Sequence, residues 1–237
     1  MTGRFIGLGV GPGDPELITL KAARLMREAD LVAYIANTWG VSQARGIAAT
    51  VLQDAPAGQR ELPVLMPMSE KREQANQVYD EAAQTIGEAL DAGKLVVFLC
   101  EGDPLFFGPF TYLLIRLEAN YNCEVVPGIS SVNAAAAALQ LPLTVLSESF
   151  AVISGRHSEA HLVDVLNTHD SVVIMKAGRA RPRILGALAT TGRTADAQYL
   201  EYIGRDNELI ERDISALDDE AGPYFSLFVV TRCERQL

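Results

Sequence analysis

One short stretch constrains the fold of this chain more than any other. Residues 95–99 form an unbroken apolar run rich in Val and Phe, and Gly102-Asp103-Pro104 follows shortly after it. Such a run is typical of a strand covered on both faces of a parallel sheet. Pro104 stops the strand, and Gly102 lets a ligand approach the backbone. Because parallel α/β sheets bind ligands at the carboxyl ends of their strands, this is a candidate binding loop, with a simple tight turn as the alternative.

Composition and charge narrow the class of protein. The 237 residues are 49% hydrophobic, which is enough for one large or two small domains, and no apolar run approaches the roughly 20 residues of a membrane helix. Cys100, Cys123 and Cys233 form no CxxC pair, and an apolar strand begins near Phe5 without a signal sequence, so we expect a cytoplasmic protein. A net charge of −10 disfavours a nucleic-acid partner.

Strands, loops and helices alternate along the first half of the chain. We expect strands at 5–8, 31–35, 60–65, 95–99 and 123–126, and helices at 17–28 and about 70–92. This alternation predicts a parallel, doubly wound α/β sheet over residues 1–126. Strand candidates at 150–153, 171–175, 198–203 and 225–230, with helices near 159–167 and 182–190, predict a second α/β domain with a mixed sheet over residues 127–237.

The first loop, residues 7–13, alternates Gly with other residues before Asp14-Pro15. It does not match GxGxxG, because Pro12 or Asp14 occupies the last position, and no acid ends the second strand. The pattern therefore disfavours a nicotinamide cofactor and indicates a stiff loop whose backbone approaches another group closely. Asp14 and Pro15 also predict the start of a helix whose Leu17, Leu20, Ala23 and Leu25 face inward.

Other chemistry-bearing residues predict no metal or nucleophile. His157 and His161 are spaced i, i+4, but a solvated helix start explains them as well and no third ligand is near. There is no GxSxG serine, and Cys100 has no adjacent cation to lower its pKa. The densest basic segment is the one that contains Lys176, Arg179, Arg181 and Arg183. Several guanidinium groups suit carboxylate recognition, so this segment is a candidate site for an anionic substrate.

Four segments taken together resemble one family. The resemblance is to the tetrapyrrole (corrin/porphyrin) methyltransferases, and it covers essentially the whole chain. The segments that carry it are residues 7–15, Gly102-Asp103-Pro104, residues 126–131, and the second domain with 173–175 and a terminal apolar strand. Residues 65–68, 98–107, 199–204 and 224–228 most resemble the branch that methylates precorrin-2 at C20. Two departures are Cys100-Glu101, where small or apolar residues are usual, and Phe107, where we would align a Tyr.

The resemblance implies a fold, a cofactor and a set of contacts. It implies two α/β domains with S-adenosylmethionine in the cleft between them, usually in a homodimer, and S-adenosylhomocysteine as product. The implied cofactor contacts are Pro12, Gly102, Asp103, Phe106, Phe107, Ser130, Ser131, Met175, Ile203, Ser226 and Leu227. A tetrapyrrole substrate carries many carboxylates, so the expected substrate contacts are Arg45, Lys176, Arg179, Arg181 and Arg183.

The implied reaction is methyl transfer to the meso carbon C20 of precorrin-2 in cobalamin biosynthesis. Tyr112, Glu101 and Asp103 are candidate proton acceptors by location alone. The alternatives are cobalt-factor II as substrate, methylation of another ring carbon, a methyltransferase acting on RNA ribose or protein, and a non-catalytic module that binds S-adenosylmethionine. The acidic charge argues against RNA.

Overall fold

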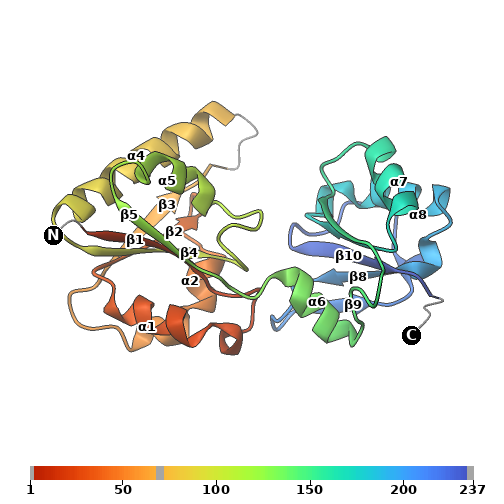
Figure 1. Cartoon of the computed structure of the whole chain (residues 1–237), viewed down its shortest axis with the longest axis horizontal. Helices are drawn as coiled ribbons and strands as arrows, with labels where there is room; N and C mark the ends of the chain where they lie inside the picture. The colour runs from red at the N-terminus through yellow and green to blue at the C-terminus, as the bar shows by residue number, and fades with distance from the viewer. Residues whose placement is uncertain (1–2, 68–71, 234–237) are drawn as a thin grey trace. The chain divides into compact units, whose positions relative to one another are not determined.

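The computed structural model describes residues 3–67 and 72–233, which form two compact units, Met1–Ser131 and Val132–Leu237. Each unit is an α/β layer structure of its own (Figure 1). The boundary expected after residue 126 coincides with the end of a strand, whereas the first unit continues to Ser131. The loop between these points stays with the first unit because Gly128 packs against Gly9 and Gly102.

The first unit is built on a sheet of five parallel strands in the order β3-β2-β4-β1-β5. The strands are β1 (Arg4–Gly9), β2 (Leu31–Ala36), β3 (Arg60–Leu65), β4 (Leu95–Cys100) and β5 (Asn122–Val126). β4 lies at the centre of the sheet and is buried from Val96 to Cys100. Because an unbroken apolar run suits a strand covered on both faces, the prediction for this stretch is confirmed.

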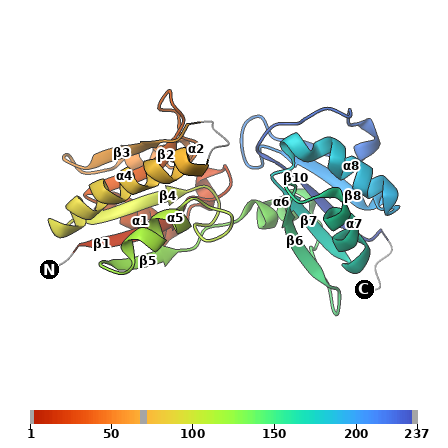
Figure 2. The same cartoon turned by 90° about the horizontal axis from the view of Figure 1, so that it is seen from above.

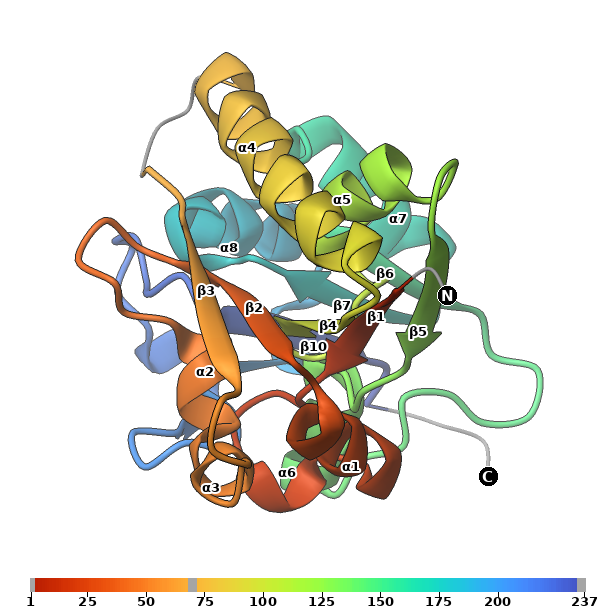
Figure 3. The same cartoon turned by 90° about the vertical axis from the view of Figure 1, so that its left-hand side faces the viewer.

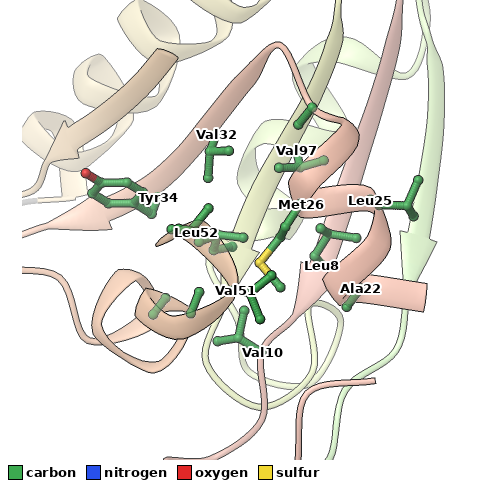
Figure 4. Packing of buried hydrophobic residues seen from close by; sticks show 14 of the residues in the cluster. Leu8, Val10, Ala22, Leu25, Met26, Val32, Tyr34, Val51, Leu52 and Val97 are labelled. Atoms are coloured by element: carbon green, nitrogen blue, oxygen red, sulfur yellow. The ribbon is translucent and has the colours of Figure 1, made fainter. Parts of the chain in front are cut away.

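Helices cover both faces of this sheet, which confirms the doubly wound prediction (Figures 1 and 3). One face packs against α1 (Leu20–Glu28), α2 (Gln43–Ile47) and α3 (Ala49–Gln53), and the other against α4 (Arg72–Asp91) and α5 (Phe110–Leu117). Figure 2 shows α4 and α5 lying over one face of the sheet. In the first of these cores, Met26 of α1 and Val51 of α3 meet Leu8 and Val97 of the sheet (Figure 4).

The first helix starts later than the sequence predicts. Asp14 caps only a short 3-10 turn, η1 (Pro15–Leu17), by accepting a hydrogen bond from the Glu16 N–H at 2.8 Å. The chain is then extended at Ile18, and Thr19 caps α1. Because α1 begins after Thr19, Leu17 lies before the helix and Leu20 is its first residue. The prediction that these two side chains face inward is wrong, since both are exposed. The predicted start of the long helix near residue 70 lies outside the described residues.

The second unit is built on a mixed five-stranded sheet in the order β6-β7-β10-β8-β9. Its strands are β6 (Phe150–Ser154), β7 (Ser171–Met175), β8 (Ala197–Glu201), β9 (Leu209–Glu211) and β10 (Ser226–Thr231). Only β6 and β7 pair in parallel, and the mixed-sheet prediction is confirmed. The short β9 is an addition to the four predicted strands.

Helices also cover the second sheet. The helices α7 (Glu159–Thr168) and α8 (Arg181–Thr190) lie side by side on one face, where they share a core with β7, β8 and β10 (Figure 2). The helix α6 (Ser131–Leu139) lies on the opposite side of this sheet (Figures 1 and 3). Within residues 3–67 and 72–233, no helix is long and apolar enough to cross a membrane.

Candidate functional site

Three loops of the first unit meet at the carboxyl ends of β1, β4 and β5. Gly11 and Gly102 exchange backbone hydrogen bonds of 2.8 and 3.4 Å, and the Val10 N–H donates to the Cys100 carbonyl at 2.9 Å. Gly11 has φ 81° and Gly102 has φ 63°, a region that glycine adopts without steric cost. The two predicted loops after β1 and β4 are therefore joined to each other through their backbones.

Two further glycines bring the third loop into direct contact with the first two. A Cβ on Gly128 would lie 2.1 Å from the Gly102 carbonyl oxygen and 2.7 Å from the Gly9 Cα. A Cβ on Gly9 would in turn lie 2.5 Å from Gly128. The sequence predicts that the backbone of the glycine-rich loop approaches another group closely. At Gly9, that group is the backbone of Gly128. Sequence reasoning missed this pairing, because no local signal connects positions so far apart.

Asp103 clamps the loop after β4 onto the loop after β5. Its Oδ1 accepts a hydrogen bond from the Leu105 N–H at 2.9 Å, and its Oδ2 accepts one from the Gly128 N–H at 3.1 Å. Both oxygens of this predicted cofactor contact therefore bind backbone amides. These contacts order the loops, and they occupy the carboxylate that the sequence offers as a candidate proton acceptor.

The surface of these loops is apolar. Leu105, Phe107 and Ile129 are exposed, and the rings of Phe106 and Phe107 meet edge to face at 5.1 Å. Phe107 has φ 57°, which is rare for a bulky residue and is typical of constrained functional loops. Half-buried Ser130 and Ser131 follow Ile129, and Ser131 opens α6. Besides the Asp103 and Glu101 carboxylates, this sheet edge thus offers neutral backbone groups and apolar walls.

Two other residues near the central loop are engaged elsewhere. Burial raises the pKa of the Cys100 thiol, which remains protonated inside the core and is no nucleophile. The Tyr112 ring stacks on Tyr79 of α4 at 4.9 Å. This candidate proton acceptor therefore contacts the helix layer, whereas Glu101 lies half-buried at the end of β4.

The second unit brings four of the predicted cofactor contacts to one end of its sheet. Leu227 of β10 pairs with Met175 of β7, and Ser226 is its neighbour. Just beyond β8, the Tyr202 N–H donates to the Phe225 carbonyl at 2.9 Å, which places Ile203 next to the same strand end. Two non-glycine residues with positive φ, Lys176 and Tyr202, stand beside this group.

The structure divides the predicted basic patch. Arg181 is buried, donates to the Glu220 carbonyl at 2.6 Å and pairs with Asp218, so it holds the loop before β10. Arg45 belongs to the first unit, where its Nε and Nη2 bind Glu61 at 3.2 and 3.0 Å. Arg179 and Arg183 are exposed, and Arg183 donates to the Gly155 carbonyl at 2.7 Å.

The predicted histidine pair lies in the second unit. The rings of His157 and His161 are 4.4 Å apart at the start of α7. Within the described part of the chain, no three His, Cys, Asp or Glu side chains are grouped so that they could hold a metal ion. A third ligand beside this pair is therefore missing from the described residues.

Comparison with known proteins decides the family. The model of the tetrapyrrole (corrin/porphyrin) methylases matches residues 4–217, which is most of the chain. The chain belongs to this family. The resemblance seen in the sequence is thereby confirmed, and the fold of this tetrapyrrole methylase agrees with that of a solved relative. The uroporphyrin-III C-methyl transferase from Thermus thermophilus, complexed with S-adenyl homocysteine, is 27% identical with a TM-score of 0.68, and the match covers 97% of each chain.

Two relatives show which branches of the tetrapyrrole methylases this chain resembles in sequence. The chain is 36% identical over 236 residues to the precorrin-2 C(20)-methyltransferase of Sinorhizobium sp, and the match covers 96% of this chain and 95% of the relative. It is 32% identical over 234 residues to the cobalt-precorrin-2 C(20)-methyltransferase of Salmonella typhimurium, with 98% of each chain covered.

Proposed function

We propose that this protein is an S-adenosylmethionine-dependent methyltransferase that adds a methyl group to C20 of precorrin-2 in cobalamin biosynthesis. The observation that carries the proposal is the 36% identity, over nearly the full length of both chains, to a precorrin-2 C(20)-methyltransferase. The loops at the carboxyl edge of the first unit support it, since this is the edge at which parallel α/β sheets bind ligands.

The residues of these loops fit the proposed cofactor. S-adenosylmethionine supplies an electrophilic methyl group on a sulfonium. A fixed anion beside that sulfonium would stabilise the ground state and slow transfer, and the Asp103 carboxylate is instead bound to the amides of Leu105 and Gly128. The proposed contacts are Pro12, Gly102, Asp103, Phe106, Phe107, Ser130 and Ser131 of the first unit and Met175, Ile203, Ser226 and Leu227 of the second.

The chain's main catalytic contribution in this proposal is positioning. Carbon C20 of the reduced macrocycle is electron-rich and attacks the methyl carbon in line while the carbon–sulfur bond breaks, so that S-adenosylhomocysteine leaves and the proton that C20 carried is released. Holding two reactants in such a geometry can supply about 7–11 kcal/mol of the barrier. The loops suit this task because Asp103 and the contact of Gly128 with Gly9 and Gly102 fix three backbones against one another.

The substrate carboxylates are proposed to bind Lys176, Arg179 and Arg183. These residues follow β7 within a stretch that holds no Asp or Glu between Asp170 and Asp196. Arg181 is withdrawn from the set, because its guanidinium is buried on Asp218 and the Glu220 carbonyl. Arg45 stays in the proposal as a residue already oriented by Glu61.

A cobalt-containing substrate is the second candidate. It is favoured by the 32% identity to a cobalt-precorrin-2 C(20)-methyltransferase, which covers 98% of both chains. The metal lies in the substrate in this case, so the same loops would position the same carbon.

Side-by-side turnover separates these possibilities. Anaerobic reactions with S-adenosylmethionine and either metal-free or cobalt-loaded precorrin-2 would be followed by mass spectrometry. The proposal expects a gain of one methyl group on the metal-free macrocycle at the higher rate. Faster turnover of the cobalt form would favour the second candidate. Cofactor binding without methyl gain on either macrocycle would contradict both and favour a non-catalytic S-adenosylmethionine-binding module.

The assembly and location of the protein are part of the proposal. We infer a homodimer in the cytoplasm from the family resemblance and from three cysteines without a CxxC pair. Light scattering coupled to gel filtration tests the dimer, since a monomer mass at micromolar concentration would contradict it.

A further inference from the structure

An exposed apolar patch lies at the carboxyl ends of β2 and β3 in the first unit. Leu65 ends β3, and Trp39 and Val41 lie in the segment that follows β2; 48%, 83% and 58% of their surfaces are exposed, and these three residues are called the patch below. None of the three belongs to the proposed cofactor contacts. Exposed apolar groups that cluster at one place on a domain are typical of binding surfaces.

The patch shares its sheet edge with the proposed cofactor loops. Tyr34 of β2 pairs with Leu99 of β4, and Ala36 pairs with Leu65, so β2, β3 and β4 end at the same level. Neighbouring strands lie about 4.8 Å apart. The loop that carries Trp39 therefore starts one strand spacing from the loop that carries Asp103 and Phe107, on the side away from β1.

Hydrogen bonds hold the Trp39 loop in an outward conformation. Asn37 Oδ1 accepts hydrogen bonds from the N–H groups of Trp39 and Val41, at 3.0 and 2.9 Å. The Asn37 N–H donates to the Val41 carbonyl at 2.9 Å, and the Gly40 N–H donates to the Asn37 carbonyl at 2.9 Å. The indole is thus presented to solvent by an ordered loop, although burying it elsewhere would stabilise the fold more.

The charge around the patch favours a polyanionic ligand. The chain contains 30 Asp and Glu residues, yet none occurs between Asp30 and Asp54. The acid opposite this segment, Glu61 of β3, is neutralised by Arg45 at 3.0 Å and accepts a hydrogen bond from the Tyr34 hydroxyl at 2.6 Å. Among the described residues, the segment that carries Trp39 therefore adds no uncompensated acid to this surface, which suits a flat macrocycle that carries carboxylates on its rim.

We propose that Trp39, with Val41 and Leu65, is the surface on which one face of the tetrapyrrole macrocycle packs. This inference rests on the proposed function; it adds Trp39 and Val41, which no sequence motif or cofactor contact includes, and gives a role to Leu65. The indole stacks on the macrocycle, while Val41 and Leu65 extend the apolar contact towards β3. The cofactor loops after β4, β1 and β5 lie on the other side and would remain free for the methyl donor.

The single tryptophan of the chain makes a direct test possible. Protein labelled with 5-fluorotryptophan gives one fluorine resonance, which belongs to Trp39. Titration with uroporphyrin III, an air-stable polycarboxylate macrocycle, is expected to shift this resonance upfield, because a stacked macrocycle shields the indole through its ring current. S-adenosylhomocysteine is expected to leave it unmoved. Calorimetric binding of uroporphyrin III without a fluorine shift would overturn the inference.

Substitutions give an independent readout. Trp39→Ala is expected to weaken uroporphyrin III binding about 3- to 10-fold, and Trp39→Phe is expected to retain most of the affinity, since aromatic stacking is preserved. Ile115→Ala, at an exposed apolar residue of α5 (62% exposed, against 83% for Trp39), is the control and leaves the affinity unchanged. Affinity for S-adenosylhomocysteine is expected to stay the same in all three variants.

The outcomes separate this inference from the proposed function. If the wild-type protein methylates precorrin-2 while Trp39→Ala binds uroporphyrin III as tightly as the wild type, only the inference fails. If the wild-type protein neither binds nor methylates a tetrapyrrole, the proposed function fails and the inference fails with it.

Discussion

At the scale of single residues, the candidate site depends on glycines that touch one another. Gly9 ends β1, and Gly102 and Gly128 lie in the loops after β4 and β5; no side chain fits where Gly128 approaches the Gly102 carbonyl oxygen. By contrast, a Cβ on Gly46, inside α2, would have no atom within 4 Å. The two glycines therefore make a matched pair for substitution.

Gly128→Ala is expected to destabilise the protein by about 1–3 kcal/mol, because overpacking forces the backbone apart. It is also expected to weaken S-adenosylhomocysteine binding. Gly46→Ala is expected to be neutral or to stabilise by up to about 1 kcal/mol, since Ala is the better helix former. Urea unfolding and calorimetry check both variants. Unchanged cofactor affinity in Gly128→Ala would argue against the proposed loops.

Tyr34 makes the stability of the first unit depend on pH. Burial and the adjacent Glu61 raise the pKa of Tyr34 to about 12, and hydrogen bonds from Arg45 lower the pKa of Glu61. A raised tyrosine pKa means that the stabilisation is complete below pH about 10 and is lost as pH rises towards 12. A lowered Glu61 pKa means that its contribution is present above pH about 4.3 and is lost as pH falls further.

Tyr34→Phe is expected to cost about 1–2 kcal/mol at pH 7, because Glu61 loses a hydrogen-bond donor. The difference from the wild-type protein is expected to shrink above pH 10 and again at acidic pH. Urea unfolding across this range measures it. A difference independent of pH would show that the hydroxyl contributes through packing alone.

At the scale of elements, apolar runs predict the strands well and caps predict the helix starts less well. The runs at 95–99 and 171–175 become β4 and β7 because both are buried on two faces. Asp14-Pro15 has the chemistry of a helix start, yet it begins only η1, since Thr19 offers a second cap. The three-residue β9 is too short for a periodic signal.

The site is predicted less completely than the fold, because its contacts join distant positions. The motif around Gly102-Asp103-Pro104 locates a loop, but the Gly128 N–H that binds Asp103 lies far along the chain. Arg181 is the clearest case. The sequence shows a cation in a basic run, whereas its burial and its bond to the Glu220 carbonyl depend on how the loop before β10 folds back.

Arg181→Ala is expected to destabilise the protein by about 3 kcal/mol, since it removes a buried cation and leaves Asp218 and the Glu220 carbonyl without their partner. Arg183→Ala is the control, because this exposed residue donates one hydrogen bond, to Gly155, and its loss is expected to cost about 1 kcal/mol or less. Thermal unfolding compares the two. Equal losses of stability in the two variants would contradict the buried role of Arg181 and would favour its assignment to the exposed basic patch.

At the scale of the whole molecule, the proposed function requires an acidic protein to bind a polycarboxylate. The net charge is −10, yet the segments between Asp30 and Asp54 and between Asp170 and Asp196 hold no acids. The first segment carries Trp39 and the second carries Lys176, Arg179 and Arg183. Local charge rather than net charge is therefore the property that suits the proposed substrate.

Salt is expected to separate the two ligands. The affinity for uroporphyrin III should fall several-fold when NaCl rises from about 0.05 to about 0.5 M, because charge pairs at the surface are screened. The affinity for S-adenosylhomocysteine should change little, since its proposed contacts are backbone and apolar groups. Arg179→Glu should weaken the first affinity and reduce its salt dependence. Salt-independent binding of uroporphyrin III would contradict the basic patch.

The central claim is that this chain methylates C20 of precorrin-2. The most direct measurement is carbon-13 NMR of the product of an anaerobic reaction with precorrin-2 and S-adenosylmethionine carrying a labelled methyl group. One new labelled methyl resonance, coupled to the C20 position, is the expected result. A labelled methyl group on any other ring carbon, or none at all in the presence of bound cofactor, would contradict the claim.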